Sequence, residues 1–294
     1  MKGKIIKGVG GFYYVHLYDE VVYECKAKGA FRNQGIKPVV GDDVEIAVVD
    51  ENALTGNIID ICDRRNELIR PAVANVDQAV IIFSLSDPEP NYNLLDRFLI
   101  MMDRQAVKTI IVLNKSDLVD MDVADRIKVI YETCGYKVFI TSTYDENDEA
   151  VKLLKQQISG KTSVFAGPSG VGKSSLLNAL KPGAKVKTGS ISEKIKRGKH
   201  TTRHSELMYV KDNTFIMDTP GFSSLYIEEM EPEELKEYYE EFAIYSPKCR
   251  FNGCVHINEP GCMVKQALED GMISELRYNN YKQMYEELKE KRKW

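Results

Sequence analysis

The sequence predicts a multidomain protein with three parts: an N-terminal β-barrel of the oligonucleotide-binding (OB) fold over residues 1–68, a central α/β phosphate-loop domain over 69–228, and a C-terminal α-helical zinc-binding domain over 229–294. Three observations predict this organisation. Short strand patterns fill the first part, apolar strands alternate with amphipathic helices in the second, and three cysteines and a histidine crowd into one segment of the third. A chain of 294 residues with 43% hydrophobic residues can bury cores for two or three domains.

The charge and hydropathy of the chain exclude several classes of protein. A formal net charge of −4 argues against a uniformly cationic nucleic-acid binder, although residues 1–40 carry seven Lys and Arg against three Asp and Glu. Lys7, His16 and several glycines interrupt the apolar residues near the N-terminus, so no signal-peptide core is expected. No apolar run reaches the length of a transmembrane helix, about 18 residues. We therefore expect a cytoplasmic protein with no membrane partner. We also expect a monomer.

Residues 1–66 contain several short strands separated by glycines. Apolar and polar residues alternate at residues 12–17, 21–25 and 44–48. Several strands of this length with glycine bends favour a small barrel of the OB type. Basic residues interleave with aromatic residues that suit either the barrel core or stacking on RNA bases, and the sequence leaves both uses open. These aromatic residues are Phe12, Tyr13, Tyr14 and Phe31.

From residue 72, apolar strands alternate with helical segments. The predicted strands cover residues 78–83, 109–113, 137–140, 162–166, 207–210 and 214–217, and amphipathic helices cover 94–104 and 124–134. This alternation predicts a parallel sheet with helices on both faces. After residue 229 the chain becomes acidic and helical, which marks the third part.

A phosphate-binding loop is predicted at residues 167–174. The pattern Gly-x4-Gly-Lys-Ser follows an apolar strand and precedes a helix over residues 174–180, which is the context that this motif requires. Its glycines let successive backbone amides face phosphate oxygens at the helix N-terminus. We expect Lys173 to reach the β- and γ-phosphates and act in catalysis, and the Ser174 hydroxyl to ligate magnesium. The predicted nucleotide contacts are Gly167, Pro168, Ser169, Gly170, Val171, Gly172, Lys173, Ser174 and Ser175.

A second motif, Asn-Lys-Ser-Asp at residues 114–117, identifies the base as guanine. The Asp117 carboxylate can accept hydrogen bonds from the N1–H and the exocyclic amine of guanine together, and adenine has no such pair of donors. We expect Asn114 at the other edge of the base and Lys115 over the ring. Ser116 is a further predicted contact, and Ser142 belongs to the predicted loop Thr141-Ser142-Thr143 that backs the guanine. The motif therefore predicts binding of GTP and GDP.

Two further segments are predicted to respond to the γ-phosphate. Asp218 ends an apolar strand and is expected to hold magnesium through water, and the Gly221 amide is expected to contact the γ-phosphate. Thr201 or Thr202 is the expected magnesium ligand of the first switch. The glycine- and lysine-rich segment 189–204 around them also fits a plain surface loop.

The residue after Gly221 is Phe222, at a place where many GTPases carry the glutamine that orients the attacking water. A phenyl ring cannot orient water, so we expect slow intrinsic hydrolysis. His200, next to the switch threonines, is the predicted catalytic residue that supplies the missing polar group.

The order of these motifs is circularly permuted. In ordinary small GTPases the phosphate loop leads and the base-reading motif follows, whereas here residues 114–117 precede residues 167–174. The central domain is therefore predicted to be a circularly permuted GTPase domain, and the protein an enzyme that hydrolyses GTP.

Four metal-ligating residues lie close together in the third part, in the pattern Cys-x4-Cys-x-His-x5-Cys. Three thiolates and an imidazole at this spacing suit a closed tetrahedral zinc site with a structural role. The alternative is three buried free cysteines beside a chance histidine. Cys25, Cys62 and Cys134 are isolated and are expected in the core. The predicted zinc ligands are Cys249, Cys254, His256 and Cys262.

The permuted motifs, the Arg-Gly-Lys-His-Thr-Thr stretch at residues 197–202, the Asp-Thr-Pro-Gly-Phe run at 218–222 and the zinc segment together resemble the RsgA/YjeQ family of ribosome-dependent GTPases, over essentially the whole chain. The resemblance implies an OB barrel, a permuted GTPase core and a zinc domain that act in late maturation of the small ribosomal subunit. It implies the small subunit and its rRNA as partners, Mg²⁺ with GTP, and one structural Zn²⁺. It also implies that rRNA contact triggers hydrolysis of GTP to GDP and phosphate, which drives release.

Two other classes of function stay open. One is an RNA-binding assembly protein in which GTP is only a structural ligand, which predicts no turnover even with ribosomes. The other is a metabolic or signalling GTPase with no RNA partner, whose activity would be indifferent to ribosomal subunits. The barrel and the zinc segment argue against the second class.

Overall fold

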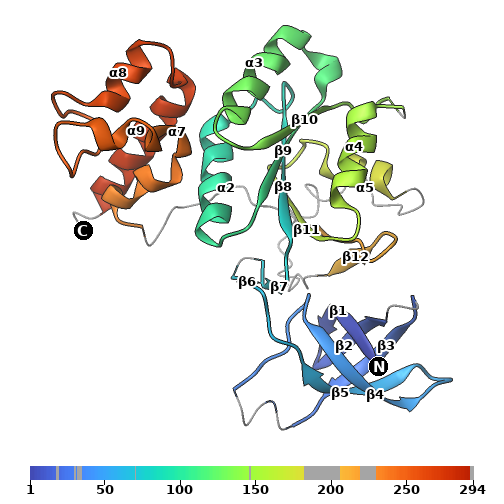
Figure 1. Ribbon diagram of the computed structural model, residues 1–294. Coiled ribbons are helices and arrows are strands. Elements are labelled where there is room, and N and C mark those ends of the chain that lie inside the picture. The colour runs from blue at the N-terminus through green and yellow to red at the C-terminus, as the bar shows by residue number, and fades with distance from the viewer. Residues whose placement is uncertain are drawn as a thin grey trace.

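The structure is a computed structural model that describes residues 1–17, 20–29, 31, 35–69, 71–145, 147–181, 206–218 and 230–291. Figure 1 shows its three parts: a barrel at the bottom, a central sheet domain, and a helical part that lies beside helix α2. This is the multidomain architecture that the sequence predicts. Among the described residues, no helix is both long and apolar enough to cross a membrane.

The first part is a closed five-stranded barrel with the strand order β1-β2-β3-β5-β4. Its strands are β1 (Lys2–Val9), β2 (Phe12–Leu17), β3 (Val22–Ala27), β4 (Asp43–Asp50) and β5 (Thr55–Ile61). Apolar side chains such as Ile5, Val15 and Ile58 are completely buried inside it. Phe31 is buried in the core, whereas Phe12 is 36% exposed, so stacking on RNA bases stays a prediction for Phe12.

The central sheet has six strands in the order β10-β9-β8-β11-β13-β12. Its strands are β8 (Gln78–Ser84), β9 (Thr109–Asn114), β10 (Lys137–Thr141), β11 (Thr162–Ala166), β12 (Leu207–Tyr209) and β13 (Phe215–Asp218). The five strands from β10 to β13 in this order run parallel to one another, as predicted.

The prediction of a wholly parallel sheet is wrong at one edge. β12 runs antiparallel to β13, with Tyr209 opposite Phe215. Only residues 210–214 join the two strands, and the Val210 N–H donates to the Thr214 carbonyl at 2.9 Å across this turn. A connection this short allows only an antiparallel pair, because a parallel pair needs a crossover of about a dozen residues or more.

Helices cover both faces of the sheet. They are α2 (Tyr92–Arg104), α3 (Met121–Glu132), α4 (Glu149–Ile158) and α5 (Lys173–Leu180), with a short 3₁₀ helix η1 (Ser116–Leu118). Successive residues of β8 face opposite layers: Ile81 shares an apolar cluster with α2 and α3, and Ile82 shares one with α4 and α5. All of β8 is buried, as expected for a strand with helices on both sides.

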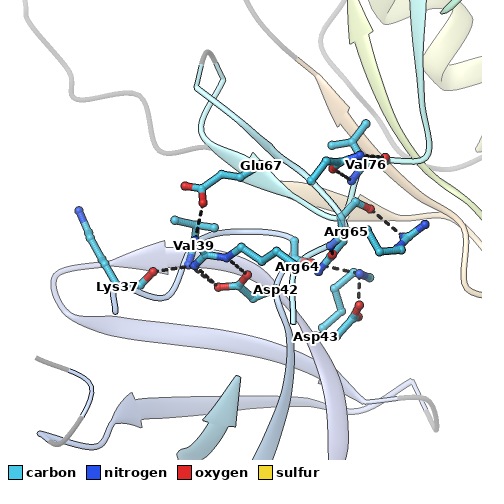
Figure 2. A network of polar contacts seen from close by, with 12 residues as sticks. Lys37, Val39, Asp42, Asp43, Arg64, Arg65, Glu67 and Val76 are labelled. Carbon is cyan, nitrogen blue, oxygen red and sulfur yellow. Dashed lines mark hydrogen bonds and ion pairs between the residues drawn. The ribbon is translucent and has the colours of Figure 1, made fainter. Parts of the chain in front are cut away.

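A short hairpin and a network of polar contacts join the barrel to the sheet domain, as Figure 2 shows. The hairpin pairs β6 (Glu67–Leu68) with β7 (Val73–Ala74), and the proposed division at residues 68 and 69 falls within it. Arg64 donates to both carboxylate oxygens of Asp42, at 2.7 and 2.9 Å, and also to Glu67. Asp42 is completely buried, so this bidentate pair ties the segment that leaves the barrel to the loop before β4.

A second contact joins the barrel to the edge of the sheet. The ring of His16 in β2 lies 4.2 Å from that of Tyr209 in β12 and 5.4 Å from that of Phe215 in β13, centroid to centroid. Lys7 and Glu206 form a backbone bridge and a salt bridge of 2.9 Å. Strands β1 and β2 of the barrel therefore lie against the edge of the sheet.

The third part is helical, as predicted. Its elements are η2 (Pro232–Tyr238), α7 (Glu240–Ala243), η3 (Ser246–Lys248), α8 (Met263–Glu269) and α9 (Glu275–Lys291). Its core is aromatic: the ring centroids of Tyr239, Phe242 and Tyr281 lie 5.0 to 5.1 Å from one another. This core packs against the cysteine and histidine segment, in which Cys254 and Cys262 are buried.

Candidate nucleotide site and metal cluster

The predicted nucleotide-binding residues meet at one edge of the sheet, where its parallel strands end. Asn114 ends β9, Thr141 ends β10, Ala166 ends β11 directly before the phosphate loop, and Asp218 ends β13. The carboxyl ends of these strands share one edge, so residues about 100 positions apart become neighbours. Ligands of open α/β sheets bind at this edge.

The phosphate loop wraps around the side chain of Lys173. Helix α5 begins at Lys173, with Ser174 and Ser175 in its first turn. The ammonium donates to the carbonyl oxygens of Gly167 at 2.7 Å and Pro168 at 2.6 Å. Burial lowers the pKa of Lys173. The cation therefore lies inside the loop, where phosphate oxygens can take the place of the two carbonyls.

Two glycines of the loop are required by packing against the sheet. A Cβ at Gly167 would lie 2.0 Å from the Ile82 carbonyl oxygen, and a Cβ at Gly172 would lie 2.2 Å from Asn114 Nδ2. Both glycines also have a positive φ, +147° and +93°. Between them, Ser169 and Gly170 are exposed, and Val171 is buried. A side chain at either glycine would push the loop away from the strands that it follows.

Asn114 joins three segments of the site. Its side chain is completely buried, its amide nitrogen donates to the Val171 carbonyl at 2.9 Å, and its amide oxygen accepts from the Thr141 hydroxyl at 3.0 Å. The end of β9, the end of β10 and the phosphate loop are thus held together by one side chain. The contact between Asn114 and the base stays a prediction.

The Asp117 carboxylate accepts a hydrogen bond from Ser142. The Ser142 hydroxyl donates to Asp117 Oδ1 at 2.6 Å, and the Ser142 N–H donates to Asp148 at 2.7 Å. Asp148 is the N-cap of α4 and accepts two further N–H groups there. Ser116 begins η1 beside Asp117. The carboxylate that is predicted to read guanine is therefore oriented by a serine anchored at a helix start.

Asp218 and Ser174 fit a magnesium ion. The Oδ1 atom of Asp218 is buried and makes no hydrogen bond with any residue that the structure describes. Burial raises the pKa of Asp218, and the positive charge of Lys173 opposes that rise. A buried carboxylate oxygen without a donor, together with the hydroxyl oxygen at the start of α5, offers the hard oxygen ligands that Mg²⁺ prefers.

Several predicted residues lie outside the described part of the chain, and their roles stay predictions. They are His200, Thr201, Thr202, Gly221 and Phe222.

The four predicted zinc ligands come together. The ligand atoms of Cys249, Cys254, His256 and Cys262 all lie within 4.8 Å of one another. Ser246 Oγ lies 3.0 Å from Nε2 of His256, which leaves Nδ1 facing the thiols, 3.4 Å from Cys262 Sγ. Burial lowers the pKa of His256 to about 4, so the imidazole is neutral at pH 7 and offers a lone pair. Three thiols and one neutral imidazole fit a closed zinc site.

The backbone around His256 is anchored from two sides. The Glu259 carboxylate accepts from the N–H groups of Val255 and Ile257, at 2.7 and 3.0 Å. The Tyr278 and Tyr281 hydroxyls of α9 donate to the carbonyls of His256 and Val255, at 2.7 and 2.6 Å. Helix α9 therefore supports the loop that carries two of the ligands.

The sequence places Thr141 in the loop predicted to back the guanine, but it does not identify Thr141 as the partner of Asn114 or Asp148 as the anchor of Ser142. No sequence pattern pairs Thr141 with Asn114, which lies 27 residues earlier in the chain. Asp148 carries a different sequence signal, because an acidic residue directly before a helix is a usual N-cap.

Comparison with known proteins places the chain in a family. Residues 61–228 match the family model described as RsgA GTPase, and residues 2–58 match the one described as RsgA N-terminal domain. Two relatives are named small ribosomal subunit biogenesis GTPase RsgA. The one from Agathobacter rectalis is 53% identical over the whole of both chains. The one from Alkaliphilus metalliredigens is 49% identical over 100% of this chain and 99% of its own.

Solved structures agree with this assignment over the whole fold. The crystal structure of YjeQ from Thermotoga maritima has a TM-score of 0.81 at 36% identity and covers 98% of both chains. The crystal structure of YloQ, described as a circularly permuted GTPase, has a TM-score of 0.78 at 39% identity and covers 99% of this chain and 95% of its own. With its permuted motifs gathered at one sheet edge, the chain belongs to the RsgA family of circularly permuted GTPases, and it is a GTP hydrolase.

Proposed function

We propose that this protein binds the small ribosomal subunit in its GTP-bound form, assists late maturation of the subunit, and leaves after hydrolysing GTP to GDP and phosphate. The observation that carries the proposal is the convergence of Asp117 and the phosphate loop 167–174 at one sheet edge, in a chain whose relatives are named for small-subunit biogenesis.

Guanine recognition rests on Asp117. Its Oδ1 already accepts from Ser142, so the carboxylate is oriented before the base arrives. The remaining lone pairs can accept from the N1–H and the exocyclic amine of guanine. Adenine offers no donors to these remaining lone pairs, so the charge-assisted hydrogen bonds that guanine makes are lost, at a cost of several kcal/mol.

Hydrolysis uses Lys173, which exchanges the carbonyls of Gly167 and Pro168 for oxygens of the β- and γ-phosphates. Ser174, Asp218 and either Thr201 or Thr202 would hold magnesium, which neutralises phosphate charge as the bond breaks. The Gly221 amide would contact the γ-phosphate. His200 would orient the attacking water in place of the side chain that Phe222 does not provide.

The barrel and the zinc part would supply rRNA contacts. The exposed ring of Phe12 lies 5.1 Å from the Lys26 ammonium, and the ring of Tyr14 lies 6.0 Å from that of Lys7. Aromatic rings beside cations can stack on bases and neutralise phosphates. One structural zinc ion would hold the loop around His256. We also propose that the protein acts as a monomer in the cytoplasm, where the small ribosomal subunit would be assembled.

Co-sedimentation tests the binding step. Purified protein is mixed with small or large ribosomal subunits, in GDP or in a non-hydrolysable GTP analogue, and centrifuged through sucrose. We expect the protein to pellet with small subunits, and more in the analogue than in GDP. Equal pelleting with both subunits, or in both nucleotides, contradicts the proposal. Binding without any turnover of GTP would favour an assembly protein in which GTP is only a structural ligand.

A further inference from the structure

A segment outside the nucleotide motifs contacts the base-reading lysine. The Lys115 ammonium donates to the backbone carbonyl oxygen of Asp87, which lies between β8 and α2. Lys115 directly follows β9 and has a φ of +64°, so the backbone turns sharply at this residue. The side chain of Asp87 is exposed, and only its carbonyl takes part in this contact.

Ser84 holds that carbonyl in place. It is the last residue of β8 and is 1% exposed. Its hydroxyl donates to the Asp87 carbonyl oxygen at 3.0 Å and accepts from the Ser86 N–H at 3.2 Å. A carbonyl oxygen has two lone pairs, so it can accept from Ser84 and from Lys115 at the same time.

The same segment touches both halves of the nucleotide site. The Leu85 N–H donates to the Asn114 carbonyl at 2.9 Å, which ties the segment to the base-reading motif. A Cβ at Gly170 would lie 3.4 Å from Pro88 Cδ, so the proline ring is in contact with the phosphate loop. Residues 84–88 therefore bridge the two motifs.

We infer that Ser84 is a positioning residue for guanine-nucleotide binding: through the Asp87 carbonyl it fixes the Lys115 ammonium, so that the lysine stem already lies where the guanine ring will stack. This inference rests on the proposed nucleotide site. A lysine stem loses conformational entropy when a ligand immobilises it, and a stem that is already held loses less. Because GDP and GTP share the base, Ser84 acts on both nucleotides equally.

A double-mutant cycle tests the inference. GDP affinity is measured for the full-length protein, Ser84→Ala, Lys115→Met and the double variant. We expect Ser84→Ala to weaken binding of GDP and of a non-hydrolysable GTP analogue by the same factor, about fivefold. In the Lys115→Met background the serine change should have no further effect. Equal losses in both backgrounds would overturn the inference, because Ser84 would then act without the lysine.

Matched variants separate positioning from folding. Ser86→Ala removes a hydroxyl two residues from Ser84 and keeps the backbone N–H of residue 86, which donates to the Ser84 hydroxyl. GDP affinity should therefore not change. If Ser84→Ala does not fold, Ser84→Thr and Ser84→Val replace it, since they have the same shape and only threonine keeps the donor. Equal GDP affinity of these two would overturn the inference. If the wild-type protein does not prefer GDP to ADP, the proposed nucleotide site itself is wrong.

Discussion

Asp96 of α2 and Arg277 of α9 form an ion pair that is buried between the GTPase domain and the C-terminal helices. Arg277 Nη1 lies 2.5 Å from Asp96 Oδ1, and the two side chains are 2% and 0% exposed. The guanidinium also contacts Glu241 at 2.9 Å and lies 4.4 Å from the centre of the Tyr239 ring. Asp96 accepts further hydrogen bonds from Tyr131 and Asn280. The two domains therefore share one polar network, whose central pair of Asp96 and Arg277 is buried.

Removal of Arg277 should be strongly destabilising. Arg277→Ala leaves the carboxylates of Asp96 and Glu241 buried without their cation, and we expect a loss of about 3–5 kcal/mol in the free energy of unfolding. The measurement is denaturant unfolding followed by circular dichroism.

A control for this variant lies on the same two helices. Glu287 of α9 pairs with Arg97 of α2 at 2.7 Å, but its side chain is 43% exposed. Glu287→Gln should cost about 1 kcal/mol or less, because solvent screens that pair. If the two variants lose equal stability, burial is not what makes the Arg277 network strong.

This network marks the limit of what the sequence could predict. Local patterns sufficed for strands such as residues 162–166, which coincide with β11, and for the cysteine and histidine spacing. Arg277 could not be placed, because an arginine in a polar helix is normally exposed and its partner Asp96 is 181 residues away. Ser84 was missed for a similar reason, since it carries no motif and acts through a backbone carbonyl.

Asp117→Asn should change the base that the protein prefers. Xanthine carries a carbonyl oxygen where guanine carries its exocyclic amine, and an asparagine amide can donate to that oxygen. We expect GDP affinity to fall by about 10²-fold or more and affinity for xanthosine diphosphate to rise. Competition binding with the two nucleotides measures this. The control is Asp122→Asn, which removes the same charge from an exposed position on α3 and should leave the preference for GDP unaltered. If Asp117→Asn still prefers GDP, the assignment of Asp117 to guanine recognition is wrong.

Zinc binding should release protons from the thiols. Burial raises the pKa of Cys254 to about 12 and also raises that of Cys262, so both thiols are protonated at pH 7 in the metal-free protein. His256, with a pKa of about 4, is already neutral and releases none. We expect the release of at least two protons for each zinc ion bound, and a zinc affinity that rises with pH. Calorimetry in buffers of different ionisation enthalpy counts them, and zero release would contradict a thiolate site.

His200→Ala tests the predicted catalytic group. We expect the variant to bind GDP as the wild-type protein does, and to lose about 10²-fold or more of its ribosome-stimulated turnover, because the attacking water is no longer oriented. His204→Ala, four residues away, is the control and should keep the stimulated rate. Unchanged stimulated turnover in His200→Ala, with nucleotide binding intact, would assign the water-orienting role to another group.

The most direct test of the proposed function is GTP hydrolysis by the purified protein alone, with small ribosomal subunits, with large subunits and with naked rRNA. We expect slow hydrolysis by the protein alone and strong stimulation by small subunits only. Equal rates in every mixture would leave the GTPase chemistry in place and contradict the link between hydrolysis and the small subunit.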